Sequence, residues 1–103
     1  MIVAEISIAP LGTESTSVSR YVAAAVESLE FSGLKCSLGP MGTTVEAESV
    51  EEVYAALAKA QAAVFEMGIK RAYTVVKMDE RRDSGRSSSD MVSAVRENLA
   101  GDR

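Results

Sequence analysis

Apolar and polar residues alternate over the first part of the chain. The even-numbered positions from Ile2 to Ile8 are all apolar, whereas Glu5 and Ser7 stand at odd-numbered positions. A period of two residues predicts a β-strand with one strongly apolar face. Pro10 is expected to end this strand, because proline has no N–H to donate to a neighbouring strand.

From residue 16 the apolar positions recur every three or four residues, which is typical of an amphipathic helix. These positions are Val18, Tyr21, Val22, Ala25, Val26 and Leu29. Gly33 is expected to stop this helix, and Gly68 to stop a second one that follows Ser49. The apolar positions of the second helix are Val50, Val53, Tyr54, Leu57, Ala60 and Val64. Ser49 and Glu52 have the spacing of a capping box, in which each side chain accepts from the backbone at the other residue.

Three more segments are expected to form strands. They are residues 34–38, 43–48 and 71–79. Gly39-Pro40-Met41-Gly42 is a turn signal between the first two, so those two strands should pair antiparallel. After the charged residues 80–86, a short helix is expected over residues 87–99. Ser87 and Asp90 would form a second capping box at its start.

The predicted order of elements is β-α-β-β-α-β followed by a terminal helix. Two interlocked right-handed β-α-β units around an antiparallel sheet give an α+β, ferredoxin-like sandwich with the strand order 4-1-3-2. We expect one such domain over residues 1–103. The first two helices cover one face of the sheet and leave the other face bare.

Strand alternation predicts what each face carries. The face under the helices combines Ile2, Ala4, Ile6, Ile8, Val45, Ala47, Ala72, Thr74, Val76 and Met78. The open face carries Val3, Glu5, Ser7, Ala9, Thr44, Glu46, Glu48, Tyr73, Val75, Lys77 and Asp79. On it we expect Lys77, Glu5, Ser7 and Glu46 to converge. A mixed apolar and charged face favours packing against a second subunit, with a solvated face as the alternative.

Composition narrows the classes of partner. The chain of 103 residues has 47% hydrophobic and 25% charged residues, which is ordinary for a soluble globular protein. A net charge of -4 argues against nucleic acid and membrane surfaces, which attract basic faces. The apolar segments are too short to span a bilayer, and the first residues lack the basic start of a signal peptide.

Two residue types restrict the chemistry. Histidine is absent, which removes the commonest general base and the commonest metal ligand, so we expect no metal site. Cys36 is the one cysteine, so no disulfide forms within the chain and a reducing, cytoplasmic location is expected. Cys36 lies in a strand-like segment, where an inert packed thiol is the expected role.

The junction between the first strand and the first helix concentrates hydroxyl groups. Gly12 is followed by Thr13, Ser15, Thr16, Ser17 and Ser19. Hydroxyls beside unpaired N–H groups at a helix start suit a polar ligand. The alternative is that these residues only cap the helix and form turns.

Glu46 is the second candidate for a binding role. A carboxylate in the middle of a strand is costly to desolvate unless a cation or a hydrogen-bond donor meets it. Lys77 is one expected partner, and a ligand with positive charge or N–H donors is the other.

Three stretches together resemble the YkoF-like thiamine-binding family of small prokaryotic proteins. They are Pro10 to Val22, Met41 to Glu46, and Tyr73 to Asp83. The resemblance covers essentially the whole chain. It implies a ferredoxin-like fold assembled into dimers and tetramers through its sheets, and a site for thiamine or its hydroxymethylpyrimidine half, as ligand rather than cofactor. It implies no enzymatic activity.

The resemblance also implies a set of ligand-binding residues in this sequence. They are Gly12, Thr13, Ser15, Ser17, Gly42, Thr43, Glu46, Lys77 and Asp79. A carboxylate and hydroxyls match the amino group and ring nitrogens of an aminopyrimidine, and an acidic site favours the cationic thiazolium ring.

The leading hypothesis is therefore a non-enzymatic binder of thiamine or a related pyrimidine that acts as carrier, buffer or sensor. One alternative is a structural or regulatory homo-oligomer, such as a homotetramer built through the open sheet face. Another is an anion site for phosphate or sulfate at the first helix start. Arg81, Arg82 and Arg86 would favour it if they folded toward that loop, whereas Glu14 and the negative net charge disfavour it. An enzyme is disfavoured, although Glu5 and Glu46 could form a carboxylate pair with one raised pKa.

Overall fold

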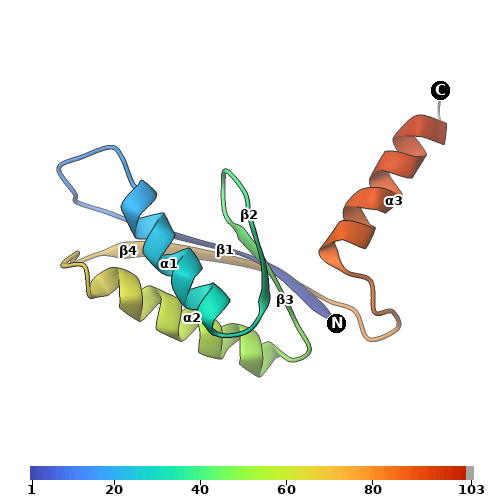
Figure 1. Ribbon diagram of the computed structural model, residues 1–103, viewed down its shortest axis with the longest axis horizontal. Coiled ribbons are helices and arrows are strands. Elements are labelled where there is room, and N and C mark those ends of the chain that lie inside the picture. The colour runs from blue at the N-terminus through green and yellow to red at the C-terminus, as the bar shows by residue number, and fades with distance from the viewer. Residues whose placement is uncertain (102–103) are drawn as a thin grey trace.

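The computed structural model describes residues 1–101 and has the order β-α-β-β-α-β-α (Figure 1). The strands are β1 (Ile2–Pro10), β2 (Lys35–Leu38), β3 (Thr43–Ala47) and β4 (Ala72–Glu80). The helices are α1 (Ser19–Phe31), α2 (Val50–Phe65) and α3 (Ser88–Gly101). All strand pairs are antiparallel, and the sheet order β2-β3-β1-β4 is the predicted 4-1-3-2 order. The fold is therefore the ferredoxin-like α+β sandwich expected from the sequence.

The core lies between the sheet and helices α1 and α2, which cover one face of it (Figure 1). Its buried members are Ile2, Ala4, Ile6, Ile8, Tyr21, Ala25, Leu29, Val45, Ala47, Val53, Ala56, Ala60 and Val64. These are the even-numbered positions of β1, the odd-numbered apolar positions of β3 and the apolar stripes of the two helices. The predicted division of β1, β3 and β4 into two faces is confirmed.

Helix starts follow local hydrogen bonding. Ser49 caps α2 by accepting from the N–H of Glu52, as predicted, and the Glu52 carboxylate reaches back to the N–H of Glu48. Helix α1 begins at Ser19, later than expected, with Val18 as its N-cap and no side-chain cap. The hydroxyls before it bond within their own loop, an alternative that serine and threonine offer the backbone in place of helix. The interpretation that they cap α1 is therefore wrong.

Helix α3 stands apart from the sandwich (Figure 1). It has no buried residue, and Val92, Val95 and Leu99 on its apolar side are exposed. Its start is closed by the predicted capping box, because Ser87 and Asp90 each accept from the backbone N–H of the other. Over residues 1–101, no helix combines the length and the hydropathy needed to cross a membrane.

Candidate functional site

Glu46 is the buried charged residue of the sheet, with 9% of its surface exposed. Its neighbours Val45 and Ala47 point into the core, so the Glu46 side chain projects from the opposite face of β3. Lys35 of β2 and Val3 of β1 stand directly opposite it in the two adjacent strands. The pairing of β3 on both sides places this carboxylate inside the sheet rather than at its edge.

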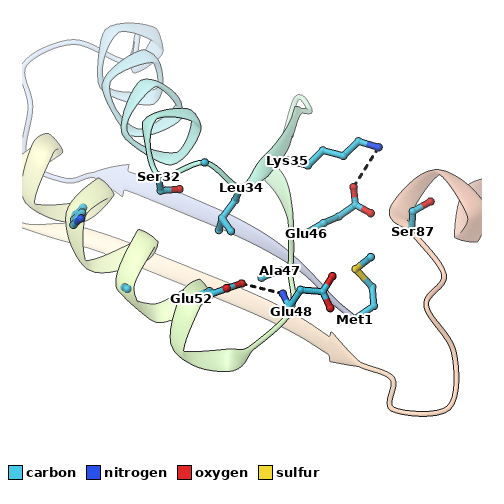
Figure 2. Close-up of a pocket in the computed structure, with 12 residues that line it drawn as sticks. Met1, Ser32, Leu34, Lys35, Glu46, Ala47, Glu48, Glu52 and Ser87 are labelled. Carbon is cyan, nitrogen blue, oxygen red and sulfur yellow. Dashed lines mark hydrogen bonds and ion pairs between the residues drawn. The ribbon is translucent and has the colours of Figure 1, made fainter.

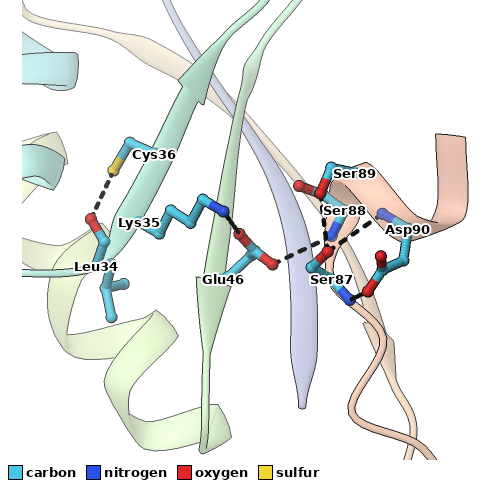
Figure 3. A network of polar contacts seen from close by, with 8 residues as sticks. All are labelled: Leu34, Lys35, Cys36, Glu46, Ser87, Ser88, Ser89 and Asp90. Atoms are coloured by element: carbon cyan, nitrogen blue, oxygen red, sulfur yellow. Dashed lines mark hydrogen bonds and ion pairs between the residues drawn. The ribbon is translucent and has the colours of Figure 1, made fainter. Parts of the chain in front are cut away.

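Two groups from different parts of the chain meet the Glu46 carboxylate (Figure 3). One oxygen, Oε1, accepts from the backbone N–H of Ser88 at 3.1 Å. The other, Oε2, lies 3.6 Å from Nζ of Lys35, which is longer than a hydrogen bond. The Lys35 side chain is 73% exposed. The carboxylate is thus held firmly by the start of α3 and only loosely by a solvated lysine.

Glu46 forms its ion pair with Lys35 and not with the predicted partner, Lys77. Lys77 stands opposite Glu5 in the β1–β4 pair, two residues along β1 from Val3, which stands opposite Glu46. Glu46 is in line with Lys35, Val3 and Asp79 instead. The expected convergence of Lys77, Glu5 and Glu46 on one point is therefore corrected: the register separates them into two cross-strand rows.

The N-terminus of α3 supplies the Ser88 N–H because the first amides of a helix have no partner within it. The Ser87–Asp90 capping box leaves Ser88 free to donate to Glu46. Hydrogen bonds from the Ser87 N–H and hydroxyl hold the pKa of Asp90 below its usual range. The helix dipole adds attraction between this end of α3 and a carboxylate.

A cavity of about 650 Å³ lies beside Glu46 (Figure 2). Apolar walls come from Met1, Leu34, Ala47 and Ala55, and charged groups from Lys35, Glu46, Glu48, Glu52 and Lys59. Three carboxylates against two lysines give it an acidic balance. A hollow of this kind suits an organic molecule with one apolar side and N–H donors or positive charge on the other.

Lys77 and Asp79 line a second hollow of about 440 Å³ on the open face of the sheet. Val3, Glu5, Thr44 and Met78 contribute to its floor and walls, and Ser88, Met91 and Val92 of α3 close one side. The backbone of Ser88 that holds Glu46 therefore also borders this hollow. Both hollows therefore border the start of α3.

The hydroxyl loop lies elsewhere. Gly12, Thr13, Ser15 and Ser17 line a hollow of about 940 Å³ together with Arg20, Lys70 and Arg71. The Thr13 hydroxyl donates to the Ser15 carbonyl at 2.9 Å, and the Ser15 hydroxyl accepts from the Ser17 N–H at 3.0 Å. These internal bonds shape the loop. The hollow is thus lined by hydroxyls, by three cationic side chains and by the acidic residue Glu14.

Gly42 and Thr43 line a fourth hollow, of about 230 Å³, under the β2–β3 turn. A Cβ at Gly42 would lie 2.9 Å from Cγ of Glu5 and 3.2 Å from the Ile6 carbonyl oxygen. A larger residue at this position would therefore crowd β1. Thr43 is buried in the β1–β3 pair.

The nine predicted ligand residues therefore do not form one pocket within one chain. Glu46 stands opposite Val3, near the start of β1, whereas the hydroxyl loop follows Pro10 at its end. A strand rises about 3.3 Å per residue, so the two groups are separated by about 23 Å along β1. Which of them contact a ligand stays a prediction.

Two residues at the candidate site were missed in the sequence. Lys35 was detectable, because a turn over residues 39–42 that pairs Leu38 with Thr43 also sets Lys35 opposite Glu46. Ser88 carried no signal, because its contact with Glu46 depends on how the segment after β4 crosses the sheet.

Comparison with known proteins shows the family. A family model described as thiamine-binding protein matches residues 4–96. The chain is 46% identical over 99 residues to a UPF0045 protein of Methanothermobacter thermautotrophicus, covering 96% of this chain and 100% of the relative. It is 33% identical to the UPF0045 protein YqgV of Bacillus subtilis, with 96% and 98% covered.

Solved structures agree with the fold. A hypothetical protein of Methanocaldococcus jannaschii superposes with a TM-score of 0.84 at 34% identity, covering 93% of this chain and 96% of that one. A protein of Thermotoga maritima, provisionally described as acting in thiamine biosynthesis or salvage, gives 0.78 at 23% identity, with 91% and 97% covered. The match to the family model over nearly the whole sheet and both core helices means that the chain belongs to the thiamine-binding protein family.

Proposed function

We propose that this protein binds thiamine or its hydroxymethylpyrimidine half without transforming it, as a carrier, buffer or sensor, and that Glu46 anchors the ligand. The observation that carries the proposal is a buried carboxylate whose second oxygen has only a solvated lysine near it. Membership of the thiamine-binding protein family supports the ligand class. The name of the Thermotoga maritima protein points the same way.

The Lys35 contact explains how a ligand could enter. An exposed ion pair contributes about 0–1 kcal/mol, so displacing the Lys35 ammonium costs little. The amino group of an aminopyrimidine would then donate to Oε2 of Glu46 from a site shielded by Met1 and Leu34. A hydrogen bond to a charged acceptor contributes about 1.5–3 kcal/mol. The exchange therefore favours the ligand.

The rest of the cavity suits the other half of thiamine. Glu48 and Glu52 line the same hollow as Glu46, and their charges attract a cationic thiazolium ring. Lys59 on the rim opposes that attraction in part. We therefore expect thiamine to bind more tightly than the neutral pyrimidine alone.

We assign no catalytic step to the site. The nearest thiol, on Cys36, donates to the Leu34 carbonyl, and burial together with the charge of Glu30 raises its pKa. A thiol with a raised pKa stays protonated near neutral pH and is a poor nucleophile. The proposed role needs only reversible binding.

Calorimetric titration tests the proposal. Thiamine, hydroxymethylpyrimidine and thiamine phosphate are injected separately into ligand-free protein, and we expect saturable thiamine binding at micromolar concentrations or below. Glu46→Gln should weaken it by about tenfold or more, since the bond to a charged acceptor is lost. Glu51→Gln, which removes the same charge from an exposed position outside the cavity, is the matched control.

Each outcome decides between candidates. No heat from any of the three titrants would refute the proposal and favour the structural homo-oligomer. Equal weakening by Glu46→Gln and Glu51→Gln would remove Glu46 as the anchor and leave only a general effect of net charge.

A second candidate is an anion site at the hydroxyl loop, and one observation favours it. Arg20, Lys70 and Arg71 line that hollow beside the hydroxyls. The arginines expected to do so lie elsewhere: Arg81 and Arg82 pair with Asp83 and Glu80, and Arg86 donates to the Asp90 carbonyl. Heat from inorganic phosphate, or from thiamine phosphate alone, would support this site.

A further inference from the structure

Helix α3 is an arm that meets the sandwich near its start and then leads away from it (Figure 1). None of its residues is buried, and Val92, Val95 and Leu99 on its apolar side are exposed. Its start is attached to the sheet by the Ser88 N–H, which donates to Oε1 of Glu46. An element with few buried apolar contacts opens at a small cost in free energy. Helix α3 is therefore expected to exchange between an attached and a released state.

The segment before α3 can serve as the hinge of this arm. The end of β4 is fixed, because the Arg81 N–H donates to the Met1 carbonyl and the Met1 amino group donates to the Arg81 carbonyl. Residues 82–86 then lead to α3 in irregular backbone, which absorbs changes in torsion angles easily. The capping box of Ser87 and Asp90 lies within the arm and would move with it. The arm can therefore leave Glu46 as a unit.

The carboxylate that attaches this arm is also the proposed ligand anchor. Its Oε1 accepts from the Ser88 N–H at 3.1 Å, and its Oε2 lies 3.6 Å from Nζ of Lys35. The last torsion of a glutamate side chain is broad when nothing holds the carboxylate. A hydrogen bond to Oε1 narrows that torsion and thereby fixes the direction of Oε2. The attached arm thus aims the oxygen that is left for the ligand.

The same arm supplies part of the walls around the site. Ser87 lines the cavity beside Glu46 (Figure 2). Met91 and Val92 line the second hollow, on the open face of the sheet. Release of α3 would withdraw these side chains from both hollows. A ligand beside Glu46 therefore meets more of the protein when the arm is attached.

We propose that the backbone amide of Ser88 positions Glu46 for the ligand, and that ligand binding in turn holds α3 in its attached state. This inference rests on the proposed function. A ligand shifts an equilibrium only by its different affinities for the two states. Here the attached state offers a carboxylate held in one orientation and the Ser87 wall, and the released state offers neither. Both differences favour binding to the attached state.

Competition between the ligand and Ser88 for Glu46 is the opposite possibility, and the geometry disfavours it. The contact at Oε2 is with a lysine side chain that is 73% exposed, and such a pair is weak. The contact at Oε1 is a part-buried hydrogen bond from a backbone amide to a charged acceptor, which is stronger. A ligand therefore displaces Lys35 more easily than it displaces Ser88.

The coupling is reciprocal by thermodynamic necessity. If release of α3 weakens thiamine binding about tenfold, which is within the usual range for coupled sites, saturating thiamine makes the released state about tenfold rarer. The order of an exposed helix then reports whether the cavity is occupied. Among the roles of carrier, buffer and sensor, this arrangement favours a sensor.

Ser88→Pro removes the amide that positions Glu46. Ser88 is the first residue of α3, where proline is well tolerated because the N–H has no partner within the helix. The thiamine dissociation constant measured by calorimetry should rise about tenfold in this variant. Ser88→Ala is the conservative variant, because it loses the hydroxyl and keeps the amide, and it should restore the affinity.

Two further measurements separate positioning from a general loss of structure. In Glu46→Ala, which has no carboxylate to position, adding Ser88→Pro should cause no further loss of affinity. Hydrogen exchange in α3 should slow about tenfold when thiamine saturates the unmodified chain, and thiamine should have no such effect in Ser88→Pro.

The outcomes separate this coupling from the proposed function. Equal affinities of Ser88→Pro and Ser88→Ala, a further loss in the Glu46→Ala background, or exchange in α3 that thiamine leaves unchanged or accelerates would each overturn the coupling. Thiamine binding by the unmodified chain would still stand in all three cases. Absence of thiamine binding by the unmodified chain would instead refute the proposed function and the coupling together.

Discussion

Replacing Glu46 by alanine should loosen α3 without opening the core. The helix buries no residue, and it is hydrogen-bonded to the sheet through the Ser88 N–H, which donates to Glu46. A helix of 14 residues is marginal in water by itself, so its order depends on that anchor. The core under α1 and α2 contains no atom of α3.

The size of the effect follows from the two contacts of the carboxylate. A hydrogen bond to a charged acceptor contributes about 1.5–3 kcal/mol, and the lower end applies because the half-exposed Ser88 N–H regains water when released. The Lys35 contact adds less than about 0.5 kcal/mol, because its ammonium is solvated. We therefore expect a loss of about 1.5 kcal/mol, which corresponds to about a tenfold change in the opening equilibrium.

Hydrogen exchange followed by mass spectrometry measures this opening. In Glu46→Ala, amides from Met91 to Asn98 should exchange about tenfold faster, whereas peptides from β1 keep their protection. Lys35→Ala is the control that removes the ion pair but leaves the hydrogen bond. Unchanged exchange in α3 of Glu46→Ala, or an equal acceleration in Lys35→Ala, would show that the Ser88 bond does not anchor the helix.

Three further predictions concern stability. Leu29→Ala should lower the free energy of unfolding by about 2–5 kcal/mol in urea titrations, while Phe31→Ala, 93% exposed on the same helix, stays within about 0.5 kcal/mol. Gly42→Ala should cost about 1–3 kcal/mol, because its Cβ meets the β1 backbone, whereas Gly101→Ala meets nothing and should cost nothing. The pKa of Asp90 is lowered in the folded chain, so its cap stabilises α3 above the pKa of the unfolded chain and this stabilisation is lost as pH falls through the pKa of the folded chain. Circular dichroism should therefore show loss of helix below about pH 4. Asp90→Asn should show the same loss already at neutral pH.

Local patterns were enough to predict the elements and both faces of the sheet. The alternation in β1 and the stripes of α1 and α2 reflect the periods of strand and helix, which any chain must obey to bury one side. The turn between β2 and β3 also fixes the register that places Lys35 opposite Glu46, because the loop of a hairpin sets how its two strands pair. The capping boxes of α2 and α3 are likewise local, because each joins residues three apart.

Only the tertiary structure decided how these parts meet. The hydroxyl loop and Glu46 were both predicted to bind the ligand, yet the pairing of β3 with β1 places them at opposite ends of β1. The bond from Ser88 to Glu46 joins residues 42 positions apart, and no local period encodes it. Side-chain periodicity specifies which face a residue occupies, whereas its neighbours across strands depend on packing of the whole sheet. The sequence by itself therefore determined the sandwich and its faces, and the folded chain determined that Glu46 is a buried carboxylate held by α3 and Lys35.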